Sequence, residues 1–418
     1  MTSPRNTQPG QRTNSKGSAR QAEGPGGRGK PGRKTGVDHA LLGVSIRQAH
    51  TLLPGFLFAA ALAWFSVWVS DFTGVRLLGF EKSPVSPVMT AILLGLIITN
   101  VIRLPSWIAP GLTFAVKKVL RLGIILLGIR LSVVEIFRLG AVGVPIVLGC
   151  IIAALLFTVL LSRALRLPEK LGTLIAVGTS ICGVSAIVAT GPAIEAKEEE
   201  IAYAVSVITI FGLVATIVYP YLANVIFGGD PIRAGLFLGT AVHDTSQVTG
   251  AALLYSDVFS RPEALNVAVV TKLVRNIFVA LVIPLMAYYY ARREAASSAT
   301  TQDGPPKRLK IAKFFPLFIL GFVLMAALRS VGDVTLNRTG AAFGLLSSGA
   351  WSGTHGFLKS WAVNFLVVAL AGVGLNTRFN TLKRLGIKPF LTGFAAAAIV
   401  GLVSYLLISL LGRFISAV

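Results

Sequence analysis

Acidic residues, histidine and cysteine are scarce in this sequence. Its 418 residues include 17 Asp and Glu, four His and two Cys, against 39 Lys and Arg. The two cysteines, Cys150 and Cys182, lie in apolar and glycine-rich stretches, so no disulfide framework is predicted. P-loop, HExxH and G-x-S-x-G patterns are absent, which argues against an ATP-driven pump, a zinc protease or a serine hydrolase. We therefore expect no resident metal, no cofactor and no enzymatic activity.

Apolar residues are abundant and occur in long runs. They make up 54% of the chain, charged residues make up 13%, and the mean hydropathy is +0.74. A helix needs about 20 residues to cross roughly 30 Å of hydrocarbon. Eleven runs approach this length, near 51–69, 86–102, 111–131, 143–161, 172–193, 201–226, 233–254, 264–290, 314–329, 358–375 and 389–411. The sequence predicts an all-α membrane protein with about ten or eleven transmembrane helices.

The excess of basic residues does not indicate binding to nucleic acid. Residues 1–50 hold nine Lys and Arg against two acidic residues, in a stretch rich in Gly, Pro and Ser. This composition predicts a disordered tail over 1–40 and a transporter domain over 41–418. Because no cleavage pattern follows the first apolar run, we expect Leu52 to Val69 to be an uncleaved first helix.

Loop charges predict the orientation in a bacterial inner membrane. Lys and Arg are retained on the cytoplasmic side. The tail, the loop with Arg163 and Lys170, the loop 291–313 with six Lys and Arg, and the loop 378–388 are therefore predicted to be cytoplasmic. The N-terminus would then be cytoplasmic, and acidic connections such as Glu195 to Glu200 would face outward.

Two weak internal similarities predict repeats, which in transporters often mark the binding region. The segment starting at Gly178 resembles the segment starting at Gly239. A second pair relates Gly128, Leu131, Pro145 and Gly149 to Gly372, Leu375, Pro389 and Gly393 at one constant offset. The expected helix orientations make inverted repeats with two interrupted helices the favoured arrangement.

The first glycine-rich segment is a candidate binding site. It places small polar residues where a lipid-facing helix would carry Leu or Ile, which predicts a helix break. The start of a half-helix offers free N–H groups to an anion, although small residues also permit close helix packing. The candidate ligands are Thr179, Ser180, Cys182, Gly183 and Ser185.

The second segment adds an imidazole and a carboxylate in an apolar stretch, at His243 and Asp244. Ionisable groups at membrane depth usually face a partner or a water-filled path, and His changes charge near neutral pH. We assign ion coupling to this pair; a solvated interfacial loop is the alternative. Neighbouring candidates for substrate binding are Thr245, Ser246 and Gln247.

A basic pair lies inside the run 264–290. Lys272 and Arg275 are three residues apart and share a helix face, with Asn276 beside them. They are too far from the helix ends for simple snorkelling, so we expect them to face inward and to balance either an anionic substrate or Asp244. All three residues are candidates for substrate binding.

The chain resembles the YeiH-like family of bacterial inner-membrane proteins, conserved hypothetical proteins to which sulfate export is assigned by inference. The similarity runs from about Leu53 to the C-terminus and rests on the segments 120–126, 178–183 and 242–244, with Lys272 and Arg275. Asp244 stands where glutamate is usual, which keeps the carboxylate. The resemblance implies a secondary transporter related to the sodium/proton antiporter and bile-acid symporter fold group.

We interpret the sequence as a secondary transporter that exports a small inorganic oxyanion such as sulfate, driven by a proton or sodium gradient. Its expected partners are the anion, the coupling ion H⁺ or Na⁺ and the lipid bilayer, with a homodimer left open and no nucleic acid. One alternative is an intramembrane enzyme that uses Cys182, His243 and Asp244 as nucleophile, base and orienting group. The other is a membrane scaffold that transports nothing.

Overall fold

The computed structural model describes residues 46–77, 86–297, 316–378 and 387–411, and helices dominate all four ranges. The predicted tail 1–40, most of the predicted loop 291–313 and most of the loop 378–388 lie outside the described residues. The α-helices are α2 (Leu53–Asp71), α3 (Pro87–Val101), α4 (Ala109–Phe114), α5 (Leu120–Leu127), α6 (Val133–Ala164), α7 (Glu169–Ser180), α8 (Val184–Ala193), α9 (Glu198–Ile226), α10 (Pro231–Ala241), α11 (Thr245–Val258), α12 (Glu263–Ile277), α13 (Val279–Ser297), α14 (Phe318–Thr339), α15 (Ser348–Asn376) and α17 (Ile387–Leu410).

The all-α membrane class is confirmed. Within the described ranges, seven helical stretches are long and apolar enough to cross a bilayer: Ala49–Asp71, Val133–Ala164, Glu198–Ile226, Glu263–Arg293, Phe318–Thr339, Ser348–Asn376 and Ile387–Leu410. The other four predicted runs are helical too. One is α3 with 15 residues, and one is α4 joined to α5 by the π-helical turn Ala115–Val119. The last two are α7 with α8 and α10 with α11, which are interrupted as predicted.

The first interruption reverses the chain. α7 and α8 lie side by side. Their close contact is shown at Gly178 of α7, where an added methyl group would be 2.7 Å from the Ile187 side chain of α8. Lys170 Nζ, at the start of α7, donates to the Glu195 carbonyl just after α8, at 3.0 Å. The segment is therefore a re-entrant hairpin, here called the first hairpin. The prediction that Glu195 to Glu200 faces the side opposite Arg163 and Lys170 was wrong, because it assumed a full crossing.

The second interruption also reverses the chain. Tyr255 Oη, late in α11, donates to Asn224 Oδ1 at 3.4 Å, close to the turn before α10. The rings of Phe259 and Tyr221 lie 5.9 Å apart at the same end. We call α10 and α11 the second hairpin. It enters from the end of α9 opposite to Lys170, so the two hairpins approach each other from opposite ends of the molecule.

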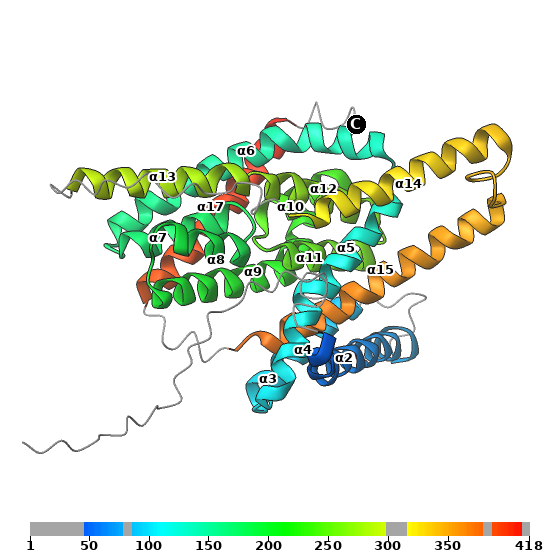
Figure 1. Cartoon of the computed structure of the whole chain (residues 1–418), viewed down its shortest axis with the longest axis horizontal. Coiled ribbons are helices and arrows are strands. Elements are labelled where there is room, and N and C mark those ends of the chain that lie inside the picture. The colour runs from blue at the N-terminus through cyan, green and yellow to red at the C-terminus, as the bar shows by residue number, and fades with distance from the viewer. Residues whose placement is uncertain (1–45, 78–85, 298–315, 379–386, 412–418) are drawn as a thin grey trace, which may run out of the picture.

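Helix packing repeats within the molecule. α6 packs on α7 and α12, whereas α17 packs on α10 and α9; α6 and α17 also pack on each other, as do α5 and α15. The same pattern of helix contacts therefore occurs twice. The first copy consists of α5, α6, the first hairpin and α9, and the second consists of α15, α17, the second hairpin and α12. In Figure 1 both hairpins lie in the block on the left with α6, α9, α13 and α17, while α14 and α15 extend to the right.

Candidate functional site

The two hairpins meet at the basic pair on α12. Lys272 and Arg275 are 1% and 0% exposed and are among the largest fully buried side chains of the described residues. α10 packs against α12 with almost no space between the backbones, since a methyl group on Gly239 would lie 2.9 Å from the Ala268 carbonyl oxygen. This close packing holds the C-terminal end of α10 beside the basic pair.

Arg275 binds the ends of both hairpins' first helices. Its Nε donates to the Ser180 carbonyl at 2.7 Å, and one terminal nitrogen donates to the carbonyls of Thr240 and Val242 at 2.6 and 3.2 Å. The other terminal nitrogen donates to the Thr179 carbonyl. The guanidinium therefore joins α7 to α10.

Lys272 completes the same cluster. Its ammonium donates to the carbonyls of Ile181 and Val242 at 2.8 and 3.2 Å, and to the His243 carbonyl. These carbonyls lie at helix C-termini, which lack intrahelical donors and carry partial negative charge. An ammonium has three N–H donors, so all of them are directed at backbone carbonyls. The basic pair was expected to balance either an anionic substrate or Asp244, and its hydrogen bonds in this structure neutralise two helix ends.

The tip of the second hairpin caps its own returning helix. Asp244 Oδ1 accepts from the Ser246 backbone N–H and hydroxyl at 2.9 and 2.7 Å. Gln247 Oε1 accepts from the Asp244 N–H at 3.1 Å, which closes a capping box, and Gln247 Nε2 donates to the Thr209 carbonyl at 3.1 Å. Gly212 leaves room for this amide, because a methyl group there would lie 1.9 Å from Oε1. Asp244 therefore supplies negative charge to the N-terminus of α11.

The tip of the first hairpin has no such cap. Gly183 precedes α8 with φ +67° and has no side chain with which to cap the helix. Among the first amides of α8, that of Ala186 donates to the Cys182 sulfur. A methyl group on Gly183 would lie 3.1 Å from Asp244 Oδ2, so the two tips touch. Cys182 is buried, whereas Ser185 is exposed. The start of α8 thus lies beside the Asp244 carboxylate and next to the exposed Ser185.

Several buried polar atoms at the tips have no partner. Both ring nitrogens of His243 lack a hydrogen bond although the residue is fully buried. Asn276 Nδ2 donates to Thr245 Oγ1 at 3.2 Å, while its Oδ1 has no partner. Buried polar groups are rarely left unsatisfied, so such atoms indicate a site that takes up water, an ion or a substrate.

The structure brings the predicted site residues together but changes which of their atoms are available. The Thr179 and Ser180 hydroxyls donate to the Ile175 and Val177 carbonyls of their own helix, at 2.7 and 3.1 Å. Their backbone carbonyls, in contrast, bind Arg275. The available groups are the α8 amides, His243, Asn276 and the second oxygen of Asp244.

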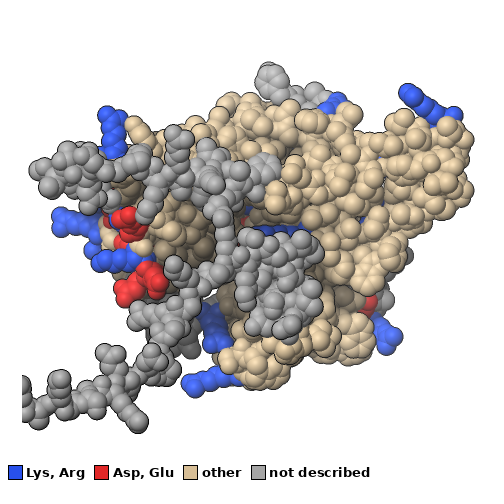
Figure 2. All heavy atoms as spheres, viewed as in Figure 1, with Lys and Arg blue, Asp and Glu red and all other residues tan. Residues whose placement is uncertain are grey.

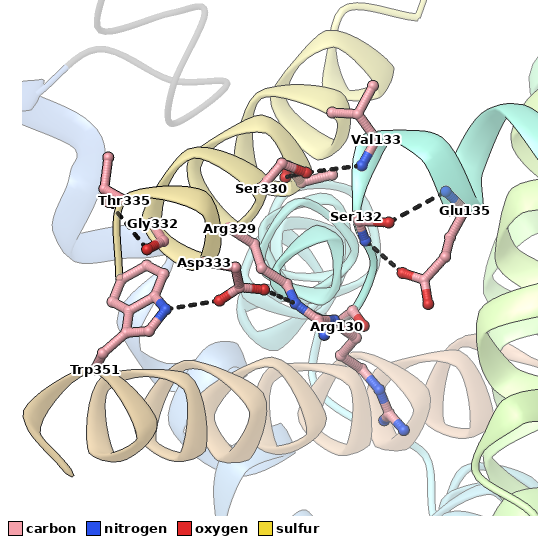
Figure 3. Close-up of polar contacts among 11 residues, drawn as sticks. Arg130, Ser132, Val133, Glu135, Arg329, Ser330, Gly332, Asp333, Thr335 and Trp351 are labelled. Carbon is pink, nitrogen blue, oxygen red and sulfur yellow. Dashed lines mark hydrogen bonds and ion pairs between the residues drawn. The ribbon is translucent and has the colours of Figure 1, made fainter. Parts of the chain in front are cut away.

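Sequence reasoning missed a polar cluster outside the hairpins, which Figure 3 shows. Arg329 pairs with Asp333 at 3.2 Å and donates to the Arg130 carbonyl. Trp351 Nε1 donates to Asp333 Oδ1 at 2.8 Å, which links α14 to α15. The cluster fixes α14 and α15 to the chain between α5 and α6. Its only sequence signal is the i, i+4 spacing of Arg329 and Asp333.

Comparison with known proteins gives a family of membrane proteins. The family described as conserved hypothetical protein 698 matches residues 54–393. A UPF0324 membrane protein of Clostridium tetani is 32% identical over 366 residues, which cover 86% of this chain and 97% of that protein. One from Corynebacterium glutamicum is 33% identical over 83% of this chain and 89% of its own length, and one from Fusobacterium nucleatum is 31% identical over 77% and 90%. No solved structure matches.

Proposed function

The chain belongs to the conserved hypothetical protein 698 family of membrane proteins, and we propose that it is a secondary transporter of a small inorganic oxyanion in the bacterial inner membrane. The observation that carries this proposal is the meeting of two re-entrant hairpins at a buried basic pair. Broken helices of this kind are tolerated at membrane depth where they are buried in protein or line a cavity, and they form substrate sites in many transporters.

The charges at the tips favour an anion. Lys272 and Arg275 contribute two positive charges and Asp244 one negative charge. The C-terminal ends of α7 and α10 carry about −0.5 each and the N-terminal ends of α8 and α11 about +0.5 each, so these four cancel. The cluster therefore has a net charge of about +1. The first two amides of α8, which Gly183 cannot cap, are the donors best placed to hold the oxygens of an oxyanion.

A dianion such as sulfate carries two negative charges, so its complex with the cluster would have a net charge of about −1. Coupling to one cation would restore balance, either by protonation of Asp244 or His243 or by Na⁺ at the Asp244 carboxylate. The free Asn276 oxygen is a further ligand for such a cation. We therefore propose H⁺ or Na⁺ as the coupling ion, with His243 and Asp244 as the coupling residues.

The positions of Cys182 and His243 argue against the alternative in which the protein is an intramembrane enzyme. A nucleophile and its base normally lie within hydrogen-bond reach. His243 makes no hydrogen bond through either ring nitrogen, so it does not contact Cys182 in this way. We propose that the protein is not an enzyme, and expect Cys182→Ser to retain full function.

The test is uptake by the purified protein in proteoliposomes. Labelled sulfate, sulfite and phosphate are offered separately, with imposed gradients of H⁺ or Na⁺ and with no gradient. The proposal expects accumulation of at least one anion that depends on one of the gradients. The proposal would be contradicted if proteoliposomes took up no more of any anion than empty liposomes do, under every gradient. If the protein takes up an anion at the same rate with and without the gradients, it is an anion carrier, but it is not coupled to H⁺ or Na⁺.

A further inference from the structure

A cavity of about 540 Å³ lies far from the hairpin tips, between the ends of α6 and α13 and the start of α7. Both α6 and the span Glu263–Arg293 end here, which places the cavity at the membrane surface. Figure 2 shows Lys, Arg, Asp and Glu side chains gathered at the left end, where α7 and α13 begin or end in Figure 1. The loop charges predict that this end is cytoplasmic.

The charged residues of the cavity have a net charge of +1. Arg293 forms an ion pair with Glu169, while Arg163 makes no ion pair with any described residue. All three line the cavity. The first helical residue of α7 is Glu169, and no side chain caps this helix, so its partial positive charge adds to the field. This arrangement fits one phosphodiester group.

The remaining lining is mostly apolar or aromatic, with the hydroxyl groups of Ser162 and Thr173 as its other polar groups. Val159 and Met286 form part of the wall, next to Tyr289. Deeper inside, Tyr290 and Thr173 share a buried hydrogen bond of 2.8 Å. A free phosphate ion would leave this wall uncovered, whereas a lipid covers it with its glycerol and acyl carbons. Apolar α6 residues such as Leu156 and Leu160 are exposed beside it and extend the surface into the bilayer.

We propose that this cavity binds an anionic phospholipid of the same leaflet, with its phosphate between Arg163 and Arg293. Basic pockets between transmembrane helices are recognised sites for acidic headgroups. α7 has 12 residues, so it spans about 18 Å from the cavity to the tip of the first hairpin. The lipid therefore holds the outer end of the helix whose inner end binds Arg275, and its binding stabilises this hairpin.

The test measures lipid binding to the full-length protein, independent of transport. The protein in nanodiscs of phosphatidylcholine, with or without phosphatidylglycerol, is followed by native mass spectrometry and by thermal unfolding. We expect phosphatidylglycerol to be retained and to raise the unfolding temperature. Arg163→Gln should lower its retention about five-fold, since a basic residue near a charged headgroup contributes about 1 kcal/mol.

Two variants make the result specific. Arg163→Lys keeps the charge and should retain most of the binding. Arg292→Gln removes a neighbouring exposed charge that does not line the cavity, and should leave binding unchanged. Equal losses in Arg163→Gln and Arg292→Gln would overturn the site. Full stabilisation by soluble glycerol phosphate in phosphatidylcholine nanodiscs would overturn the lipid as occupant.

Discussion

The two hairpins share the same architecture, two short antiparallel helices joined at a break, but the residues at their tips differ. Cys182 and Gly183 of the first correspond in the aligned segments to His243 and Asp244 of the second. The first tip has no ionisable group other than the Cys182 thiol, and its N-cap Gly183 has no side chain to cap α8, whereas the second has an imidazole and a carboxylate that caps α11. The difference indicates a division of labour, in which the first tip offers N–H donors to the substrate and the second carries the charge that couples transport to a cation.

The largest expected effect comes from the residue that joins the hairpins. Arg275→Ala removes hydrogen bonds to two carbonyls of each hairpin, and each buried carbonyl left unsatisfied costs about 1–3 kcal/mol. We expect transport to be lost and the unfolding temperature to fall markedly. Lys272→Ala should also abolish transport but destabilise less, because Lys272 binds three carbonyls. Thermal unfolding and uptake per molecule of folded protein measure both effects.

Arg275→Lys and Arg233→Ala serve as controls. The lysine keeps the charge but cannot reach all four carbonyls, so partial transport and intermediate stability are expected. Arg233 is a partly exposed residue of α10 paired with Asp230, and its loss should change little. Normal stability of Arg275→Ala would show that the guanidinium does not hold the hairpins together.

An intermediate effect is expected at the glycine of the first tip. Gly183→Ala must adopt φ +67°, which costs a non-glycine residue about 1–3 kcal/mol, and its methyl group would press on Asp244. We expect transport to fall about ten-fold while the protein still folds. The matched control is Gly353→Ala in α15, where a methyl group would meet no atom within 4 Å. If both variants transport equally well, the first tip is not part of the site.

The smallest effect on folding, and the most specific effect on function, is expected at the second tip. Asp244→Asn keeps a good N-cap for α11 but removes the charge, so stability should change by less than about 1 kcal/mol. Accumulation against a gradient should disappear, while exchange of labelled for unlabelled anion should remain. His243→Ala should lose pH-driven accumulation if the proton resides on the imidazole. Loss of exchange in Asp244→Asn would instead place this carboxylate in substrate binding.

The sequence predicts helices and breaks well, because both depend on local residue types. Gly178 and Gly239 begin segments whose small and polar residues cannot form lipid-facing helix, and the chain is interrupted within five residues of each glycine. The reversal was not predicted, because two antiparallel helices of 12 and 10 residues have the same hydropathy as one 22-residue span. The misassigned side of Glu195 follows from this ambiguity.

The inward position of the basic pair was also predictable, but its partners were not. Burial of Lys272 and Arg275 follows from their distance from both ends of the apolar span Glu263–Arg293, of which α12 is the first part. Which groups they bind depends on where the C-termini of α7 and α10 lie in space, and a single sequence does not contain this information. The hydroxyls of Thr179 and Ser180 were expected to bind substrate, yet they bind backbone carbonyls of their own helix.

The length of the hairpin arms has an electrical consequence. Arms of 10 to 14 residues extend about 15–21 Å, so both tips lie near the middle of roughly 30 Å of hydrocarbon. The electrostatic energy of a unit charge changes by about 2.3 kcal/mol per 100 mV when the charge crosses the whole membrane. For a charge that moves only as far as the tips, the energy changes by about half of this value. Occupancy of the tips by an ion arriving from one side should therefore depend on the membrane potential even when no net transport takes place.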